Sequence, residues 1–348
     1  MRALGIDVGT TNIKIVELSG SAGEINLENY GVLETYSYLE RPNAAIQTSY
    51  FKIVEEITFD LLKKLLSSLK PKTRRAVISL PIFSSFVTVF DVPLREESEI
   101  ARAVPFEAKK YIPLPLEELT IDWAIIKRGD ESGQNSKSKI LLIAFPKELL
   151  YRYKRIAKDA NLDVVAFELE SVALVRSLVG KNKSPVLVVD IGSQAANLIV
   201  IDEGYLMSNE SLTVAGSEIT HVISQGLGVS KERAEEFKRV KGFNVEPQEA
   251  EVVNLMLPLI DYFGNEILRT INIYKEKSAK EIKEVILAGG AANLPGLEGY
   301  LGQYTNLEVK RAWPFKSIKY QEFLEPLLRE IGPSLSVATG LAMRGVIY

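Results

Sequence analysis

The sequence contains no cysteine, and this absence excludes several kinds of chemistry at once. Without a thiol, the chain can hold no disulfide framework, no cysteine–zinc site and no cysteine nucleophile. Histidine is almost as scarce, since His221 is the only one. A single imidazole cannot form a histidine-rich metal site, and it argues against a Ser–His–Asp triad. We expect His221 to be a packed or surface residue rather than a catalyst.

Long apolar runs and an excess of one charge are lacking too. The chain has 42 basic and 45 acidic residues, a net charge of −3, so its charge indicates neither a nucleic acid nor an anionic membrane as a partner. No uninterrupted apolar stretch approaches the roughly 20 residues of a transmembrane helix. The N-terminus leads into an expected strand without the features of a signal peptide. We therefore expect a cytoplasmic protein, and its 348 residues favour about two domains.

A glycine–threonine turn with an aspartate at its mouth lies between two short apolar runs near the N-terminus. The pattern predicts a β-hairpin whose tip can hold a phosphate. Gly9 lets backbone N–H groups approach an anion, Thr10 and Thr11 add hydroxyl donors, and Lys14 adds a positive charge. Asp7 suits a hydrated Mg²⁺ that accompanies the phosphates. A motif this short also marks ordinary turns, so its context has to support it.

The same pattern recurs in the second half of the chain, where an apolar strand leads into Asp190, Gly192 and Ser193 and a second apolar strand follows. Lys14 and Asn197 each stand seven residues after their aspartate. Two such hairpins from opposite halves of the chain can face one another and clamp a triphosphate. Asp190 would then join the first hairpin's aspartate in ordering the waters of the metal ion.

A third glycine-containing stretch follows an apolar strand that ends at Ala288. Gly289 and Gly290 form a turn whose flat backbone can lie against the adenine and ribose of a nucleotide, with Asn293 beside it. Three loops in this order resemble the nucleotide-binding fold of the actin, Hsp70 and sugar-kinase superfamily. The resemblance extends along nearly the whole chain. It implies an α/β protein with the actin-like ATPase fold, in which two ribonuclease-H-like lobes enclose the nucleotide.

A stretch of different character separates the first two glycine loops. Residues 82–145 predict a small α/β subdomain, with strands over 85–92, 120–126 and 139–144 and a helix over 96–110. Actin and Hsp70 lack an insert at this place, whereas the bacterial proteins FtsA and PilM have one. The expected division of the chain is a first lobe of residues 1–81, 146–170 and the C-terminal helix 333–348, the insert 82–145, and a second lobe of residues 171–332.

The helices predicted outside the insert follow the 3.6-residue period of apolar side chains. A long helix within residues 246–279 is expected to be interrupted or bent at Pro258. The closing helix is expected to begin at Pro333, and a further helix to cover residues 168–178.

The resemblance implies roles for several further residues. In the superfamily, the helix before the second phosphate strand begins with a Glu or Gln near the attacking water, and Glu170 matches that position; Asn197 is a second candidate for placing this water. Bacterial actin relatives hold the ribose with Ala-Glu-x-x-Lys, which here gives Glu235 and Lys238, with Gly216 opening the preceding helix. Two alternatives stay open. Glu170 also suits a helix start without any catalytic role, and Glu235 with Lys238 also suits an exposed ion pair.

Within the superfamily, the chain most resembles the PilM family of actin-like proteins in type IV pilus assembly. FtsA, the division-ring anchor, is the nearest alternative, but its terminal linker and amphipathic membrane helix are not expected here. Small-molecule kinases of the superfamily are a second alternative, and no motif for their catalytic aspartate is evident. The PilM resemblance is carried by the Tyr-Ile-Pro segment within Phe106–Trp123, by Gly216–Thr220 with Ala234–Lys238, and by Ala338–Arg344.

The PilM resemblance implies a cytoplasmic scaffold that binds ATP and Mg²⁺ and is at most a weak ATPase. A nucleotide between two lobes would mainly fix their relative angle and thereby the shape of a partner site. The implied partner is the cytoplasmic N-terminal tail of a PilN-like bitopic membrane protein, bound in a groove between the first lobe and the insert. That partner would recruit the chain to the inner membrane. Contact with a pilus motor ATPase, self-association through the insert, and a role in a related secretion system stay open.

Overall fold

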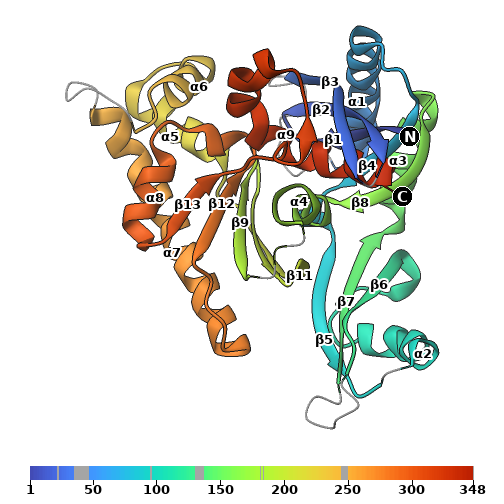
Figure 1. Cartoon of the computed structure of the whole chain (residues 1–348). Coiled ribbons are helices and arrows are strands. Elements are labelled where there is room, and N and C mark those ends of the chain that lie inside the picture. Colours follow the sequence, from blue (N-terminus) through green and yellow to red (C-terminus); the bar gives the residue numbers. More distant parts are fainter. Residues whose placement is uncertain are drawn as a thin grey trace.

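The computed structural model describes residues 1–21, 23–34, 47–94, 96–129, 137–180, 182, 184–243 and 250–347, with residues 47–57 and 250 described by their backbone only. Three β-sheets organise this part of the chain, as Figure 1 shows. We call the part built on the six-stranded sheet the first lobe and the part built on the five-stranded sheet the second lobe. The part built on the three-stranded sheet is called the insert.

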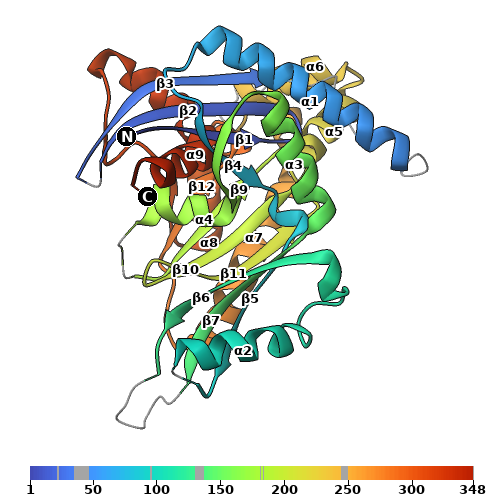
Figure 2. The same cartoon turned by 90° about the vertical axis from the view of Figure 1, so that its right-hand side faces the viewer.

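The first lobe is a six-stranded sheet with helices on both faces. Its strand order is β14-β3-β2-β1-β4-β8, and β1 to β3 form an antiparallel meander. Apolar residues that alternate along β1 and β2 serve two cores, one shared with α1 and α3 and one shared with α9. Figure 2 shows α1 and α3 lying across this lobe. The elements are β1 (Arg2–Val8), β2 (Asn12–Ser21), β3 (Glu24–Glu34), β4 (Arg75–Leu80), β8 (Asp163–Leu169), β14 (Ile318–Lys319), α1 (Gln47–Leu69), α3 (Lys147–Asp159) and α9 (Glu325–Ile347).

The second lobe repeats this plan with a five-stranded sheet in the order β11-β10-β9-β12-β13. Its central strands are almost continuously apolar because both of their faces are buried. One face packs against the lobe's own helices, and the other contributes to a core shared with α9, α4 and the insert. The elements are β9 (Val186–Ile191), β10 (Ala196–Asp202), β11 (Tyr205–Leu212), β12 (Glu284–Ala288), β13 (Glu308–Arg311), α4 (Glu170–Leu174), α5 (Gly216–Leu227), α6 (Lys231–Val240), α7 (Ala250–Ser278) and α8 (Leu297–Thr305).

The insert is a three-stranded sheet, β5-β7-β6, covered on one face by α2. The other face joins the core between the lobes, where Val89 and Leu141 pack with Val186 and Leu206 of the second lobe. The insert therefore touches both lobes instead of hanging from the first alone. Its elements are β5 (Phe86–Val92), α2 (Glu97–Ala108), β6 (Leu119–Lys127) and β7 (Ser138–Pro146), with short turns of helix at η1 (Ile82–Ser84) and η2 (Leu116–Glu118).

Helix α9 lies between the two sheets and approaches its neighbours at glycines. A Cβ atom at Gly5 of β1 would lie 1.9 Å from the carbonyl oxygen of Ala338, and one at Gly340 would lie 2.0 Å from that of Ala173 in α4. Only glycine allows backbones to come this close. The contacts hold α9 directly against the strand of the first phosphate hairpin and against α4.

Two expected element boundaries were wrong. Helix α9 begins at Glu325 rather than at Pro333, because Pro326 occupies its first turn, where no N–H is needed, and Pro333 lies inside the helix. The predicted helix over 168–178 starts only at Glu170, since residues 168 and 169 complete β8. The expected interruption at Pro258 was also wrong, because α7 continues through this residue as one element, whereas the alternative of a bend there stays a prediction. Residues 246–249 of that prediction lie outside the described part of the chain.

The short strand β14 comes from the stretch expected in the second lobe, yet it pairs with β3 of the first sheet. β14 joins this sheet because Phe315 and Ile318 are buried in the first lobe's core, among residues of β1, β2 and α9. The residue ranges given for the lobes otherwise stay a prediction.

Candidate functional site

The two predicted phosphate hairpins have the same backbone geometry. The Gly9 N–H donates to the Asn12 carbonyl at 3.0 Å, and the Gly192 N–H donates to the Ala195 carbonyl at 3.0 Å. Behind each turn, the aspartate stands directly across from the residue seven positions later, so Asp7 faces Lys14 and Asp190 faces Asn197. The sequence repeat is therefore a structural repeat, one copy in each lobe.

A polar network fixes the aspartate of the first hairpin. The Lys14 Nζ lies 3.3 Å from one Asp7 oxygen, and the Ser79 hydroxyl donates to the other at 3.1 Å. The Ser79 oxygen in turn accepts from the Val8 N–H at 3.1 Å. Thr11 at the tip of this hairpin is buried, whereas Thr10 is half-buried. Sequence reasoning missed Ser79; the only signal was one hydroxyl inside the apolar run of β4.

The second hairpin lies against the start of α5. The carbonyls of Gly192 and Ser193 accept from the N–H groups of Gly216 at 3.0 Å and Ser217 at 2.8 Å. These bonds explain the glycine that opens α5, because a Cβ there would lie 3.1 Å from the Gly192 oxygen. The Asn197 side-chain oxygen accepts from the Ser211 hydroxyl at 2.7 Å. This bond uses one of the two lone pairs of the Asn197 oxygen, so the asparagine could orient a water through its NH₂ group or through the remaining lone pair.

Three carboxylates converge beside these hairpins. Glu170 opens α4, and its Oε2 accepts from the Ile82 N–H at 3.2 Å. Burial raises the pKa of Glu170 well above its usual range, and the nearby charges of Asp7 and Asp190 raise it further. Burial also raises the pKa of Asp190 to about 6; Lys14 opposes this shift, and Asp7 adds to it. The three carboxyl groups therefore interact electrostatically although they come from different segments of the chain.

Tyr153 of α3 belongs to the same surroundings. Its pKa is raised by burial first, and then by the negative charges of Glu170 and Asp7. No sequence pattern pointed to this tyrosine, because it lies on an amphipathic helix whose other residues are ordinary surface and core positions.

The carboxylates suit a metal ion that keeps its own waters. Within the described ranges, no group of three or more Asp, Glu or His side chains is close enough to bind a metal directly. Repulsion between neighbouring carboxylates contributes to the raised pKa values of Glu170 and Asp190, and a hydrated cation would offset this repulsion. Mg²⁺ commonly binds through one or two carboxylates, waters and phosphate oxygens.

The third loop has the features expected of a surface for a nucleoside. Gly289 has a φ of +84°, and a Cβ there would lie 2.4 Å from the Ile191 oxygen. Its N–H donates to the Pro333 carbonyl of α9 at 3.0 Å. A Cβ added at Gly290 would face open space and have no neighbouring segment within 4 Å. The side-chain oxygen of Asn293 is buried without a hydrogen-bond partner among the described residues, so it could accept a bond from a ligand.

The pair predicted for the ribose is not an exposed ion pair. The Lys238 Nζ lies 2.5 Å from Glu235 Oε2, 2.8 Å from the Thr220 hydroxyl and 3.0 Å from the Gly216 carbonyl. The Lys238 side chain is only 8% exposed, and its burial lowers its pKa although Glu235 opposes the shift. The exposed alternative was therefore wrong. Thr220 is a further member that sequence reasoning missed.

One ion pair joins the two lobes beside this cluster. Arg239 of α6 bonds the free oxygen of Glu235 at 2.9 Å and also Glu34 at 3.0 Å. Glu34 ends β3 directly across from Asn12 of the first phosphate hairpin. The predicted ribose site and the first phosphate turn are thus connected through one guanidinium. His221, by contrast, is exposed on α5.

Comparison with known proteins identifies the family and the fold of the chain. A family model described as type IV pilus assembly protein PilM matches residues 5–346. A chain of a solved PilM–PilN type IV pilus biogenesis complex is 23% identical, with a TM-score of 0.84 over 99% of both chains. MreB5 of Spiroplasma citri bound to ADP is 14% identical, with a TM-score of 0.55 over 97% of this chain and 94% of that one.

Among curated proteins, the cell division protein FtsA of Bacillus subtilis (strain 168) is 22% identical over 321 residues, which cover 84% of this chain and 71% of FtsA. The structural similarities confirm the predicted actin-like ATPase fold. Across the part of the chain that the structure describes, no helix has both the length and the apolar character to span a membrane.

Proposed function

The chain belongs to the PilM family of type IV pilus assembly proteins, and on this basis we propose that it is a cytoplasmic scaffold that binds Mg–ATP between its lobes and holds the tail of a bitopic membrane protein. The observation that carries the nucleotide site is the convergence of Asp7, Lys14, Glu170 and Asp190 from both lobes. The family match favours this function over the FtsA-like and small-molecule kinase alternatives.

Each predicted residue has a place in the proposed nucleotide site. Backbone groups of Gly9, Thr10, Thr11, Gly192 and Ser193, with the Lys14 ammonium, would hold the phosphates. Asp7 and Asp190 would order the waters of Mg²⁺, whose charge would lower the mutual repulsion of the carboxylates. Gly289, Gly290 and Asn293 would line the adenosine, and Glu235 with Lys238 would contact the ribose.

Hydrolysis would be slow at most. Water placement rests on Glu170 and on Asn197, whose side-chain oxygen already accepts one bond from Ser211. Burial raises the pKa of Glu170, which makes its carboxylate a stronger base, but its Oε2 is held by the Ile82 N–H. The main effect of the nucleotide would be to fix the angle between the lobes. The insert, packed against both, would change its position with that angle.

The nucleotide site is tested by titrating the purified protein with ATP in the presence and absence of Mg²⁺, using calorimetry. Asp7→Ala should weaken Mg–ATP binding at least about tenfold, because it removes one of two carboxylates proposed to order the metal. Asp60→Ala on the exposed face of α1 is the matched control and should leave the affinity unchanged. An unaltered affinity of Asp7→Ala would refute the role given to this residue.

The tail site is proposed where the first lobe meets the insert. Two aromatic side chains are exposed there: Phe83 in η1 is 51% accessible and Tyr151 of α3 is 63% accessible. The Lys147 Nζ of α3 also donates to the Glu117 carbonyl of η2 at 2.7 Å, which ties the two walls together. Exposed aromatic residues beside a polar rim are typical of surfaces that bind apolar peptide segments. The neighbour in the PilM–PilN complex supports a PilN-like partner.

A fluorescent peptide with the N-terminal sequence of the organism's own PilN-like protein provides the test. Phe83→Ser together with Tyr151→Ser should weaken its binding at least about tenfold. Phe323→Ser, which alters a side chain 75% exposed on η6 (Glu322–Leu324), is the control and should bind as the wild type does. Equal peptide binding by the wild type, the double variant and the control would show that the tail binds another surface.

A further inference from the structure

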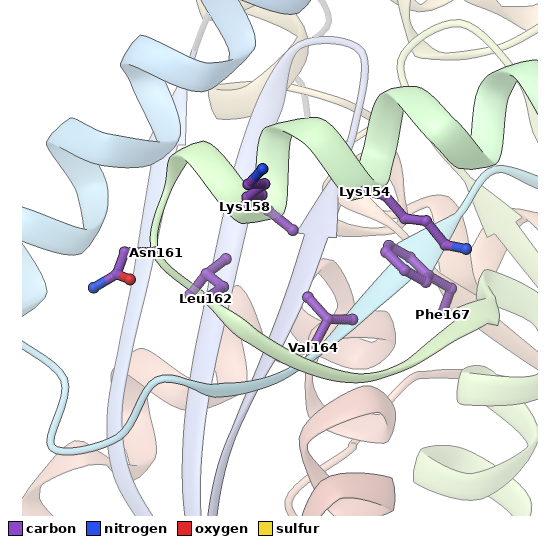
Figure 3. A pocket seen from close by; sticks show the side chains of 7 residues that line it. Lys154, Lys158, Asn161, Leu162, Val164 and Phe167 are labelled. Atoms are coloured by element: carbon purple, nitrogen blue, oxygen red, sulfur yellow. The ribbon is translucent and has the colours of Figure 1, made fainter.

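A pocket of about 360 Å³ opens between α3 and β8 in the first lobe. Figure 3 shows two lysines of α3 on one side and apolar side chains of β8 and the preceding turn on the other. None of the residues that line it is assigned to the nucleotide or to the tail in the proposals above. The lining includes Lys154, Ala157, Lys158, Leu162, Val164 and Phe167.

The strand beside the pocket is the last strand of its sheet. In the described part of the chain β8 pairs with β4 alone, so its other side carries backbone groups without a strand partner. The register slips at Val165, which leaves that side chain 39% exposed. A free sheet edge readily accepts an added strand. Where a helix flanks the edge, side chains of the added strand can enter the space between helix and sheet.

The helix beside the pocket is strongly basic. Lys154 and Lys158 lie one helical turn apart and form its rim. Lys154 lies over the ring of Tyr151 at 5.7 Å, and neither lysine has a carboxylate within ion-pair distance in the described residues. The other charges of α3 are Lys147, Arg152 and Arg155 against Glu148 and Asp159. The rim therefore favours an anionic group, while the floor of the pocket is apolar.

We propose that the groove between α3 and β8 binds an extended peptide segment of a protein partner, in which apolar and acidic residues occupy alternate positions on one face. The segment adds as a strand to the free edge of β8. Every second side chain then points toward α3. An apolar one fills the pocket against Leu162, Val164 and Phe167, and an acidic one reaches Lys154 and Lys158. Main-chain hydrogen bonds supply affinity, and the pocket with its lysines supplies specificity.

This site is distinct from the nucleotide site and borders the tail site, because Lys154 lies over the ring of Tyr151. Its lining comes from the first lobe alone, and it includes neither Phe83 nor Tyr151. A scaffold with both grooves could hold two extended segments at once. An anionic lipid could bind the same lysines, but it would not form main-chain hydrogen bonds with the edge of β8. The test therefore includes a measurement on β8 itself.

The experiment selects random dodecapeptides displayed on phage against the full chain and then measures synthetic copies by fluorescence anisotropy. The expected peptides carry an apolar and an acidic residue two positions apart, so that both side chains point to the same face of the added strand. The double substitution Lys154→Glu and Lys158→Glu should weaken the binding of these peptides at least about tenfold, because two attractions to the acidic residue become repulsions. Lys63→Glu with Lys64→Glu on the exposed face of α1 changes the net charge equally and should bind within about twofold. Phe83→Ser should also leave binding unchanged.

Backbone amide exchange provides a second measurement that does not depend on a variant. A bound peptide should protect amides in residues 163–167, because the added strand pairs with β8. The proposal is overturned if selection enriches no such peptides, if the enriched peptides bind the α3 variant as tightly as the wild type, or if β8 gains no protection. It is also overturned if the α3 variant loses only its affinity for vesicles that contain anionic lipid.

Discussion

At the scale of single residues, the site depends on groups that are held by partners outside their own motif. Ser79 and Lys14 bond the two oxygens of Asp7, and the Ile82 N–H holds Glu170. The partners come from β4, β2 and η1, so the carboxylates keep their positions without a ligand. Such preorganisation lowers the reorganisation needed when a cation and a phosphate bind.

Glu17 of β2, which lies outside the proposed metal site, offers a test of how burial changes the pKa of a single carboxyl group. It is 2% exposed, accepts from the Lys72 N–H at 2.9 Å, and lies 3.9 Å from Arg2. Burial is the largest cause of its raised pKa, and the bond from Lys72 opposes that shift. The folded chain therefore holds this proton at a higher pH than the unfolded chain does.

The sign of the pH effect follows from this difference. Between the unfolded pKa of about 4.5 and the raised folded pKa, the folded state binds more protons, so the free energy of unfolding falls as the pH rises. Glu17→Gln keeps the acceptor for Lys72 and removes the titration. Urea unfolding of both proteins from pH 4.5 to 7 should show the wild type losing stability relative to the variant. A constant difference across this range would contradict the raised pKa.

At the scale of elements, α9 depends on small residues that let it touch β1 and α4 directly. Gly340→Ala should lower the free energy of unfolding by about 3 kcal/mol or more, because the new methyl would lie 2.0 Å from the Ala173 carbonyl. Gly299→Ala on α8 is the matched control. No atom lies within 4 Å of its added Cβ, so the helix should gain about 0.5–1 kcal/mol. Denaturant unfolding of both variants measures the contrast, and equal stabilities would contradict it.

The segment after α4 is held by a partly buried charge network. Residues Val175–Val179 form a π-helical turn. Within that turn Arg176 makes two bonds to Glu168 at 2.6 and 2.8 Å and one to the Gly340 carbonyl at 3.0 Å. Arg344 of α9 adds a bond to Glu168 at 2.6 Å. Because Glu168 lies two residues before Glu170, this network also fixes the turn that presents Glu170 to the site.

At the scale of the whole molecule, Glu34 and Arg239 connect the lobes beside the proposed nucleotide site. Glu34→Gln removes the negative charge from this contact and so weakens it, and it leaves the bond from Arg239 to Glu235 in place. The pair is about half exposed, so its loss should speed the release of a fluorescent ATP analogue only about two- to fivefold in stopped-flow measurements. Glu24→Gln on the same strand, which loses the surface pair with Lys319, is the control.

The same pair can be tested without nucleotide. Because the chain has no cysteine, one cysteine introduced on each lobe takes a spin label without a background signal. The distances between the labels should spread more widely in Glu34→Gln than in the wild type or in Glu24→Gln. Identical distributions, together with identical release rates, would show that the ion pair does not restrain the lobes.

The sequence by itself determined the elements whose cause is local. The Asp-x-Gly turns between apolar runs predicted both hairpins, since glycine and the alternation of apolar residues set a hairpin without help from distant contacts. Their order along the chain, with the third glycine loop, was enough to infer the actin-like fold. The insert was predicted too, because its short strands and its helix follow apolar periods of their own. In the structure these segments form a small core of their own.

The tertiary structure alone decided what depends on contacts between distant segments. The start of α9 and the pairing of β14 with β3 follow from burial against the first sheet, which no local pattern encodes. Ser79, Tyr153 and Thr220 are ordinary residues of a strand and two helices until the fold brings them to the site. The same holds for Arg239 and Glu34, 205 residues apart, because an ion pair requires only proximity in space and leaves no pattern along the chain.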